Sequence, residues 1–352
     1  MRISYLNIDN FMLFDSFKID WSPNINIISG ENSTGKTTLI KLMYAALQPI
    51  SKKKFSAMTQ EQMEDAIVEK MQGVFRPDDG KIGRLVSRKQ GSNKTDIKIG
   101  LEKKDAISIG FGYRQERHIN LKVEIDDSKK FEPVYLPPKE MISSTEHFQS
   151  LYDEYHIDFE EMYYDLTKLL DRPLKRGANT AEQNKVLSSF ENIIDGSIVR
   201  REKKFYLKMK GSGEFEMGLV SEGFRKLATI VYLISSGSLD KNAILFWDEP
   251  ETNMNPKMMK YIAEAVVELA KMGVQVFITT HDYFVQQSFN LISAYPKMNK
   301  DNLVFNFVSL YKNEEGKIQY TSAERVSDLE HNSIMEEFDA LYMREQDIIY
   351  DN

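Results

Sequence analysis

Almost uninterrupted apolar runs occur at three places in the chain, and each is about as long as a strand. They are residues 25–28, 243–247 and 274–280. Such runs are typical of strands that are buried on both faces of a sheet. Helical spacing follows two of them, from residue 39 and over residues 256–272, and a further helix is predicted over residues 221–235. Buried strands that alternate with helices predict a parallel sheet covered on both faces, and therefore an α/β fold.

Alternation of apolar and polar residues predicts a second group of strands. They lie at residues 2–9, 16–29, 95–102, 106–113, 119–125 and 134–136. The first two segments lead into the apolar run at residue 25, and the next three predict an antiparallel meander. The sheet is therefore expected to be mixed, with an antiparallel β subdomain beside the parallel strands.

The middle of the chain predicts a helical lobe inserted between these strands. Residues 139–194 are helical in pattern, with breaks at Arg172-Pro173 and Gly177. Their aromatic and acidic stretch, residues 148–164, is expected to pack inward, and a partner-docking face is the alternative. Residues 197–217 predict a lysine- and arginine-rich hairpin that turns at Lys210–Gly213. A basic hairpin can follow a nucleic-acid backbone, but no periodic stacking residues support that role.

The chain divides into four expected parts. Residues 1–138 form the N-terminal part of the head, 139–196 the helical lobe, 197–311 the C-terminal part of the head, and 312–352 a tail. A terminal hairpin is predicted from residues 303–311 and 317–320, with a helix over residues 334–343. Solvated or mobile loops are expected at Lys52–Lys54, a short basic run, and at residues 75–92, which are rich in Gly, Pro, Asp and Lys.

Composition excludes several classes of protein. The absence of cysteine excludes disulfides, thiolate metal sites and cysteine nucleophiles. No apolar run reaches about 18 residues, so no membrane-spanning helix is expected. The N-terminus begins a strand pattern and does not resemble a signal peptide, so a cytoplasmic location is expected. The formal net charge of −7 disfavours non-specific nucleic-acid binding by the whole surface, although a local basic groove is still compatible with it.

The strongest motif is the stretch from Gly30 to Thr38, which fits the phosphate-binding pattern G-x-x-x-x-G-K-[ST]. A buried strand precedes it and a helix follows, as the chemistry requires. Glycines let successive N–H groups turn toward phosphate oxygens, and the helix N-terminus attracts the same anion. Lys36 is expected to reach the β- and γ-phosphates of ATP, and Thr37 to ligate Mg²⁺. The nucleotide-binding residues predicted here are Gly30, Asn32, Ser33, Thr34, Gly35, Lys36, Thr37 and Thr38.

Two further groups follow apolar strands. Asp248 and Glu249 end the strand at residues 243–247 in the manner of a Walker B motif. Asp248 is expected to hold Mg²⁺ and Glu249 to act as general base on the attacking water. His281 ends the next strand, where a γ-phosphate sensor is expected. Lys36, Glu249 and His281 are therefore the predicted catalytic residues.

Together these motifs resemble those of ABC-class ATPases. The stretch Asp248–Pro256 is similar to that of OLD-like and RecF-like members, as are Leu6–Phe11 and Val134–Glu140. The resemblance implies that two heads face each other head to tail across two ATP sites. Ser221 and Gly223 would form the signature that meets the γ-phosphate of the opposite head. In place of the usual Q-loop glutamine, Lys139 or Glu140 would have to serve.

The whole chain resembles small prokaryotic ATPases of anti-phage defence or toxin–antitoxin-like modules. The leading hypothesis is an ATP-gated homodimeric switch that acts on a protein effector, a nuclease or toxin, supplied as a separate chain. The alternative is a RecF-like DNA-repair or DNA-maintenance ATPase that binds DNA, although the sequence lacks coiled-coil heptads. A transporter subunit is disfavoured because the transporter-type signature is absent.

Overall fold

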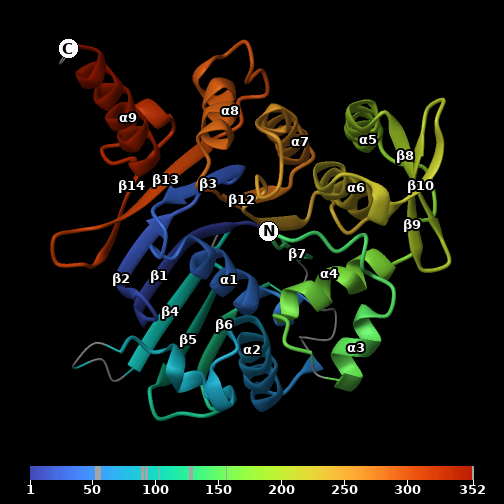
Figure 1. The fold of residues 1–352 in the computed structure, drawn as a ribbon. Coiled ribbons are helices and arrows are strands. Elements are labelled where there is room, and N and C mark those ends of the chain that lie inside the picture. The colour runs from blue at the N-terminus through green and yellow to red at the C-terminus, as the bar shows by residue number, and fades with distance from the viewer. Residues whose placement is uncertain are drawn as a thin grey trace.

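The structure is a computed structural model that describes residues 1–51, 57–88, 91, 94–102, 104–126, 130–155 and 157–350. The basic run Lys52–Lys54 lies outside these residues. The described residues form three sheets, with most of the helices packed around the central one (Figure 1). None of the helices in the described ranges has the length and hydrophobicity needed to cross a membrane.

The central sheet has six strands in the order β14-β13-β3-β12-β11-β7. Their bounds are β3 Ile25–Gly30, β7 Glu132–Leu136, β11 Ala243–Asp248, β12 Gln275–Thr279, β13 Phe305–Lys312 and β14 Ile318–Ala323. All neighbours are parallel except β13 and β14. Every residue of β3, β11 and β12 is buried, because both faces of the sheet are covered. This confirms the predicted α/β fold with a mixed sheet.

Alternate residues of these strands pack into two cores, one on each face of the central sheet. On one face, residues such as Phe246 and Phe277 pack against α1 and α2. On the other, residues such as Trp247 and Ile278 pack against the remaining core helices. The helices are α1 Lys36–Leu47, α2 Gln60–Phe75, α4 Glu161–Asp171, α5 Ala181–Ile194, α6 Glu222–Ser235, α7 Met259–Lys271 and α8 Tyr283–Ala294.

The predicted meander is part of a larger antiparallel sheet, which also contains the first two strands of the chain. Its order is β2-β1-β4-β5-β6. The bounds are β1 Ile3–Phe11, β2 Phe14–Asp20, β4 Lys94–Leu101, β5 Ala106–Gly112 and β6 Asn120–Glu124. The prediction of a mobile loop at residues 75–92 is wrong for residues 75–88, which the structure describes. Ile82, Leu85 and Val86 are buried there, in and beside a short 3-10 helix at Ile82–Leu85.

The helical lobe contains α3 Phe148–Tyr155, α4 and α5, so the predicted breaks near residues 173 and 177 are confirmed. The hairpin predicted at residues 197–217, with its turn at Lys210–Gly213, is confirmed in part: the turn joins two antiparallel strands, but a further strand precedes them. The segment forms a three-stranded sheet of β8 Gly196–Arg201, β9 Lys204–Met209 and β10 Gly213–Glu216. The turn between β8 and β9 contains no glycine. Glu202 takes the left-handed conformation in this turn, at φ 55°. Without a turn residue as a signal, the first connection could not be recognised.

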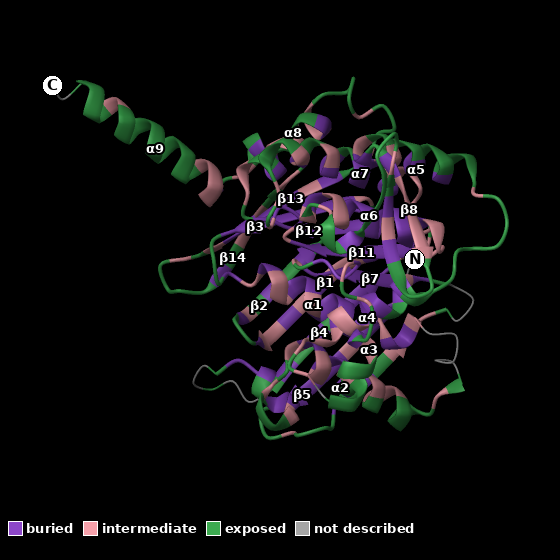
Figure 2. Ribbon diagram, turned by 45° about the vertical axis from the view of Figure 1, so that its right-hand side comes forward, coloured by how far each residue is buried: buried purple, intermediate pink, exposed green. Residues whose placement is uncertain are grey.

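The C-terminal helix α9 spans Ser333–Tyr350 and is longer than the predicted helix at residues 334–343. None of its residues is buried, and it extends away from the rest of the molecule (Figure 2). Its base stays in contact with α8, since Phe338 stacks on Tyr283 at a ring distance of 4.8 Å. Exposed apolar side chains, among them Leu341 and Ile348, run along the free part of the helix.

Candidate functional site

The phosphate loop lies between β3 and α1, and its two glycines cannot be replaced without cost. Gly30 has φ 136°, and a Cβ at this position would lie 2.2 Å from the carbonyl oxygen of Leu310 in β13. Gly35 has φ 96°, and its Cβ would lie 2.5 Å from the ring of Phe14. The sequence pattern therefore reflects two close approaches as well as the curvature of the loop.

Lys36 lies inside the curve of this loop. Its Nζ donates hydrogen bonds to the carbonyl oxygens of Gly30 at 2.8 Å and Glu31 at 2.9 Å. Burial lowers the pKa of the ammonium, and the nearby carboxylates of Glu249 and Asp248 oppose that shift. Asn32 and Ser33 are exposed at the tip of the loop, and Thr34 is buried and bonds the Glu31 carbonyl at 2.8 Å. Thr38 is partly buried in the first turn of α1.

Asp248, at the end of β11, accepts hydrogen bonds from three side-chain hydroxyl groups. Its Oδ1 accepts a hydrogen bond from Thr37 Oγ1 at 2.9 Å and one from Thr279 Oγ1 at 2.5 Å. Its Oδ2 accepts a hydrogen bond from the Tyr135 hydroxyl at 2.9 Å. The fold thus joins Thr37 to Asp248 across more than 200 residues of sequence, as the motifs predicted. Neither Tyr135 nor Thr279 was identified from the sequence.

This donor set fits Mg²⁺ rather than a softer metal. Thr37 and Asp248 offer hydroxyl and carboxylate oxygens, which Mg²⁺ prefers, and Mg²⁺ commonly takes its other ligands from phosphate and water. Within the described ranges, no group of three or more His, Cys, Asp or Glu side chains is arranged to hold a metal. A two-residue oxygen site beside a phosphate loop is therefore the best candidate for a metal in this part of the chain.

Glu249 and His281 lie together beyond the ends of β11 and β12. The Nδ1 atom of His281 is 3.4 Å from Glu249 Oε1 and 3.5 Å from Glu251 Oε1. Glu249 has the unusual φ of 43°, and its N–H bonds the carbonyl oxygen of Thr279 at 3.2 Å. Burial raises the pKa of the Glu251 carboxyl, against hydrogen bonds from Thr280 and from the His281 backbone. The imidazole therefore lies between two carboxylates, of which the sequence indicated only Glu249.

The predicted signature residues begin α6. Ser221 is the exposed N-cap, and its hydroxyl makes no capping hydrogen bond. Gly223 is buried, and a Cβ there would lie 3.1 Å from Met254. Among the residues that the structure describes, no hydrogen bond joins Ser221 or Gly223 to the phosphate loop. Within the described residues of one chain, the predicted signature and the phosphate loop are therefore not joined by hydrogen bonds.

Of the two residues expected in the Q-loop position, Lys139 is exposed and Glu140 is buried. The Glu140 carboxylate is occupied away from the phosphate loop, 3.2 Å from Arg225 Nε of α6 and bonded by the hydroxyl of Ser143 at 2.6 Å. It is Tyr135, four residues before Lys139, that bonds Asp248, the predicted metal ligand.

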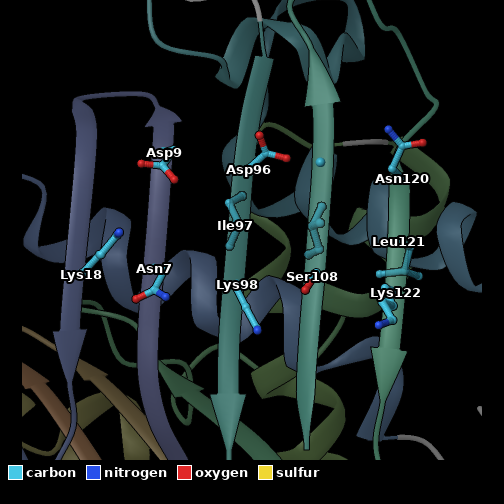
Figure 3. Close-up of a pocket in the computed structure, with 12 residues that line it drawn as sticks. Asn7, Asp9, Lys18, Asp96, Ile97, Lys98, Ser108, Asn120, Leu121 and Lys122 are labelled. Atoms are coloured by element: carbon cyan, nitrogen blue, oxygen red, sulfur yellow. The ribbon is translucent and has the colours of Figure 1, made fainter.

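A hollow of about 490 Å³ lies on the outer face of the antiparallel sheet, away from the phosphate loop (Figure 3). Its walls carry charges of both signs, including Lys18, Lys98 and Lys122 beside Asp9 and Asp96. It contains none of the predicted site residues. Because its charges are mixed, it has no electrostatic preference for an anionic ligand.

The fold and the site together are like those of ABC-class ATPase heads, and the motifs are similar to those of the RecF-like branch. More particularly, the chain belongs to the family described as "AAA domain, putative AbiEii toxin, Type IV TA system", whose model matches residues 25–285. Both the sequence motifs and the structure are in agreement with that assignment.

Two kinds of relative support this conclusion. A stretch of 105 residues is 28% identical to the DNA replication and repair protein RecF of Halalkalibacterium halodurans, covering 30% of this chain and 28% of that protein. The chain therefore matches less than a third of that relative's length.

Solved structures of SMC heads share the fold at 11% identity. The SmcHead bound to the C-winged helix domain of ScpA has a TM-score of 0.57, covering 92% of this chain and 98% of its own. The head from Thermotoga maritima has a TM-score of 0.51, covering 92% of this chain and 99% of its own. The head from Pyrococcus furiosus, with an extended coiled coil and the ScpA C-terminal domain, has 0.53, covering 98% and 99%.

Proposed function

We propose that this protein binds and hydrolyses ATP with Mg²⁺, and that it works as an ATP-gated dimeric switch for a partner effector. The observation that carries the proposal is the Thr37–Asp248 hydrogen bond, with Glu249 and His281 directly beyond it. It unites a phosphate loop, an oxygen site for Mg²⁺ and a candidate general base at one edge of a parallel sheet. Ligands bind at this edge in open α/β folds.

Each residue then has a defined task. Loop N–H groups, the N-terminus of α1 and Lys36 bind the phosphates. Thr37 and Asp248 would hold Mg²⁺, which neutralises charge on the β- and γ-phosphates when it is bound. Glu249 accepts a proton from the attacking water, and its fixed backbone aims the carboxylate. His281 donates a hydrogen bond to the γ-phosphate, while Glu251 fixes the orientation of the imidazole.

Dimerisation through the ATP sites is the second part of the proposal. Ser221 is exposed at a helix N-terminus and its hydroxyl caps nothing, so it is free to meet a phosphate on another chain. In a head-to-tail pair, Ser221 and Gly223 of one head complete the site of the other. ATP can then drive association only by the difference in its affinity for the closed and open states.

A role in anti-phage defence or a toxin–antitoxin-like module is supported by the description of the family. Binding of a partner protein is supported by the SMC head that was solved with a domain of ScpA. We therefore propose an effector that is supplied as a separate chain, a nuclease or a toxin. Its action would follow the opening and closing of the two heads.

DNA binding is the alternative, and the match to RecF favours it. The basic three-stranded sheet offers limited support, because several of its cations are already paired. Arg200 pairs with Asp171, Arg201 with Glu214 at 2.8 Å, and Lys204 with Glu146 at 3.1 Å. DNA binding that weakens steeply with salt would favour this alternative. Co-purification of an effector would favour the switch.

The decisive experiment is light scattering on Glu249→Gln with and without Mg-ATP. This variant keeps every phosphate contact but lacks the base, so it is expected to accumulate as an ATP-bound dimer. Lys36→Ala is the matched control, and it should stay monomeric because it no longer binds ATP. A Glu249→Gln mass that is the same with and without nucleotide would refute the ATP-driven dimer. Hydrolysis at the parent rate would refute Glu249 as the base.

A further inference from the structure

The two oxygens of the Asp248 carboxylate are held by different elements. Thr37 and Thr279 both donate to Oδ1, and Tyr135 alone among the described residues donates to Oδ2, at 2.9 Å. Thr37 belongs to the phosphate loop and Thr279 to the neighbouring strand β12. Tyr135 comes from the other side, from the edge strand β7. The orientation of the carboxylate therefore depends on three hydroxyl groups.

Tyr135 is built into the sheet in a way that fixes its hydroxyl. β7 pairs with β11 in parallel register, with Tyr135 opposite Phe246, two residues before Asp248. The ring is 1% exposed and packs against the ring of Tyr44 at 5.3 Å. The strand pairing and the ring contact therefore fix where the hydroxyl lies.

We propose that Tyr135 is a positioning residue for Mg²⁺ binding: its hydroxyl fixes the Asp248 carboxylate so that Oδ1 faces Thr37. The inference rests on the proposed Mg-ATP site. Removing the hydroxyl leaves Oδ2 buried without a donor, and the carboxylate is then free to rotate away from its productive orientation. Partners that orient a metal ligand in this way typically change metal affinity by roughly 10–100-fold when they are removed.

The neighbouring tyrosine provides a matched control. Tyr44 is as deeply buried as Tyr135, and the two rings are in contact. Its hydroxyl donates at 2.6 Å to Asp165, a carboxylate that Lys70 also bonds, and not to Asp248. Tyr44→Phe therefore removes the same atom from the same packed cluster without touching the metal-binding aspartate.

The experiment compares the parent with Tyr135→Phe and Tyr44→Phe. A fluorescent ATP analogue is titrated onto each protein without Mg²⁺ and across a series of Mg²⁺ concentrations, and hydrolysis is followed over the same series. We expect Tyr135→Phe to raise the half-saturating Mg²⁺ concentration by roughly tenfold or more. We expect its nucleotide affinity without Mg²⁺ to equal that of the parent, which also shows that the variant is folded.

Two results would overturn the inference while the proposed function stands. One is an unchanged Mg²⁺ dependence in Tyr135→Phe, and the other is an equal shift in Tyr44→Phe, which would indicate a general packing effect. A parent protein that binds no nucleotide at any Mg²⁺ concentration would instead refute the proposed function, and the inference with it. If the parent binds ATP but does not hydrolyse it, the binding titration still decides.

Discussion

Gly30→Ala is the sharpest test of the phosphate-loop geometry. Gly30 pairs with Leu310 across β3 and β13, and the new Cβ would lie 2.2 Å from the Leu310 carbonyl oxygen. That is about 1 Å inside normal contact distance, and the neighbour is backbone in the middle of a sheet, so it cannot swing aside. The residue also has φ 136°, which an alanine side chain disfavours.

The two effects add. Inserting an atom into a packed core typically costs about 1–3 kcal/mol, and the positive φ about 1–2 kcal/mol more. We therefore expect Gly30→Ala to lower the free energy of unfolding by about 2–5 kcal/mol. Gly211→Ala is the control, because Gly211 has φ 77° but nothing within 4 Å of the added Cβ. It should cost about 1–2 kcal/mol, from backbone strain alone.

Urea unfolding followed by tryptophan fluorescence measures both variants, since Trp21 and Trp247 are buried in the two cores. Binding of a fluorescent ATP analogue then reports on the loop. Gly30→Ala should be the less stable variant and should bind nucleotide weakly, whereas Gly211→Ala should bind as the parent does. Equal stability of the two variants would refute the argument that β13 blocks a side chain at residue 30.

Three further predictions follow from single contacts. Glu251→Gln should bind ATP normally but hydrolyse it roughly tenfold or more slowly, because His281 loses a carboxylate that orients it; an unchanged turnover rate would contradict this. Burial lowers the pKa of Lys226 to about 8 from 10.5. Between these two pH values the unfolded chain binds a proton that the folded chain lacks, so the free energy of unfolding should rise with pH by up to about 3 kcal/mol. Urea unfolding at pH 7.5 and 10 measures the rise, which should be smaller in Lys226→Met; an equal rise in that variant would assign it to other groups. Deleting residues 340–352 should leave the melting temperature within about 1 °C of the parent, because no residue of α9 is buried; a large loss would mean that α9 folds back onto the body.

The parts of the fold that the sequence predicted are those whose pattern is local. The strands β3, β11 and β12 are uninterrupted apolar runs, and few alternatives fit such runs next to helices. The helix α8 was not predicted. Its buried face includes the polar Gln286, while Phe284 and Leu291 on its outer face are exposed, so its pattern of apolar residues is blurred.

The residues of the site divide in the same way, into those that belong to a local sequence motif and those that do not. Thr37 and Asp248 belong to motifs whose spacing reports their chemistry, and the structure joins them with a hydrogen bond. Tyr135 belongs to no such motif. A tyrosine in an apolar strand is typical of a core residue and does not by itself indicate a functional one. Its partner lies 113 residues away along the chain. Only the parallel pairing of β7 with β11 brings the two together, and that pairing was not predicted.

The helix that carries the proposed signature is bonded at two points to segments beside the proposed catalytic site. Lys226 Nζ donates to the carbonyl oxygens of Pro250 at 3.1 Å and Thr252 at 2.7 Å, in the loop that follows Asp248 and Glu249. Arg225 is paired with Glu140, on the segment that follows β7 and Tyr135. Because α6 is held both to the loop that follows Asp248 and to the segment that follows Tyr135, we expect a force on its exposed N-terminus to act on the proposed catalytic carboxylates. This gives the proposed switch a physical route between heads.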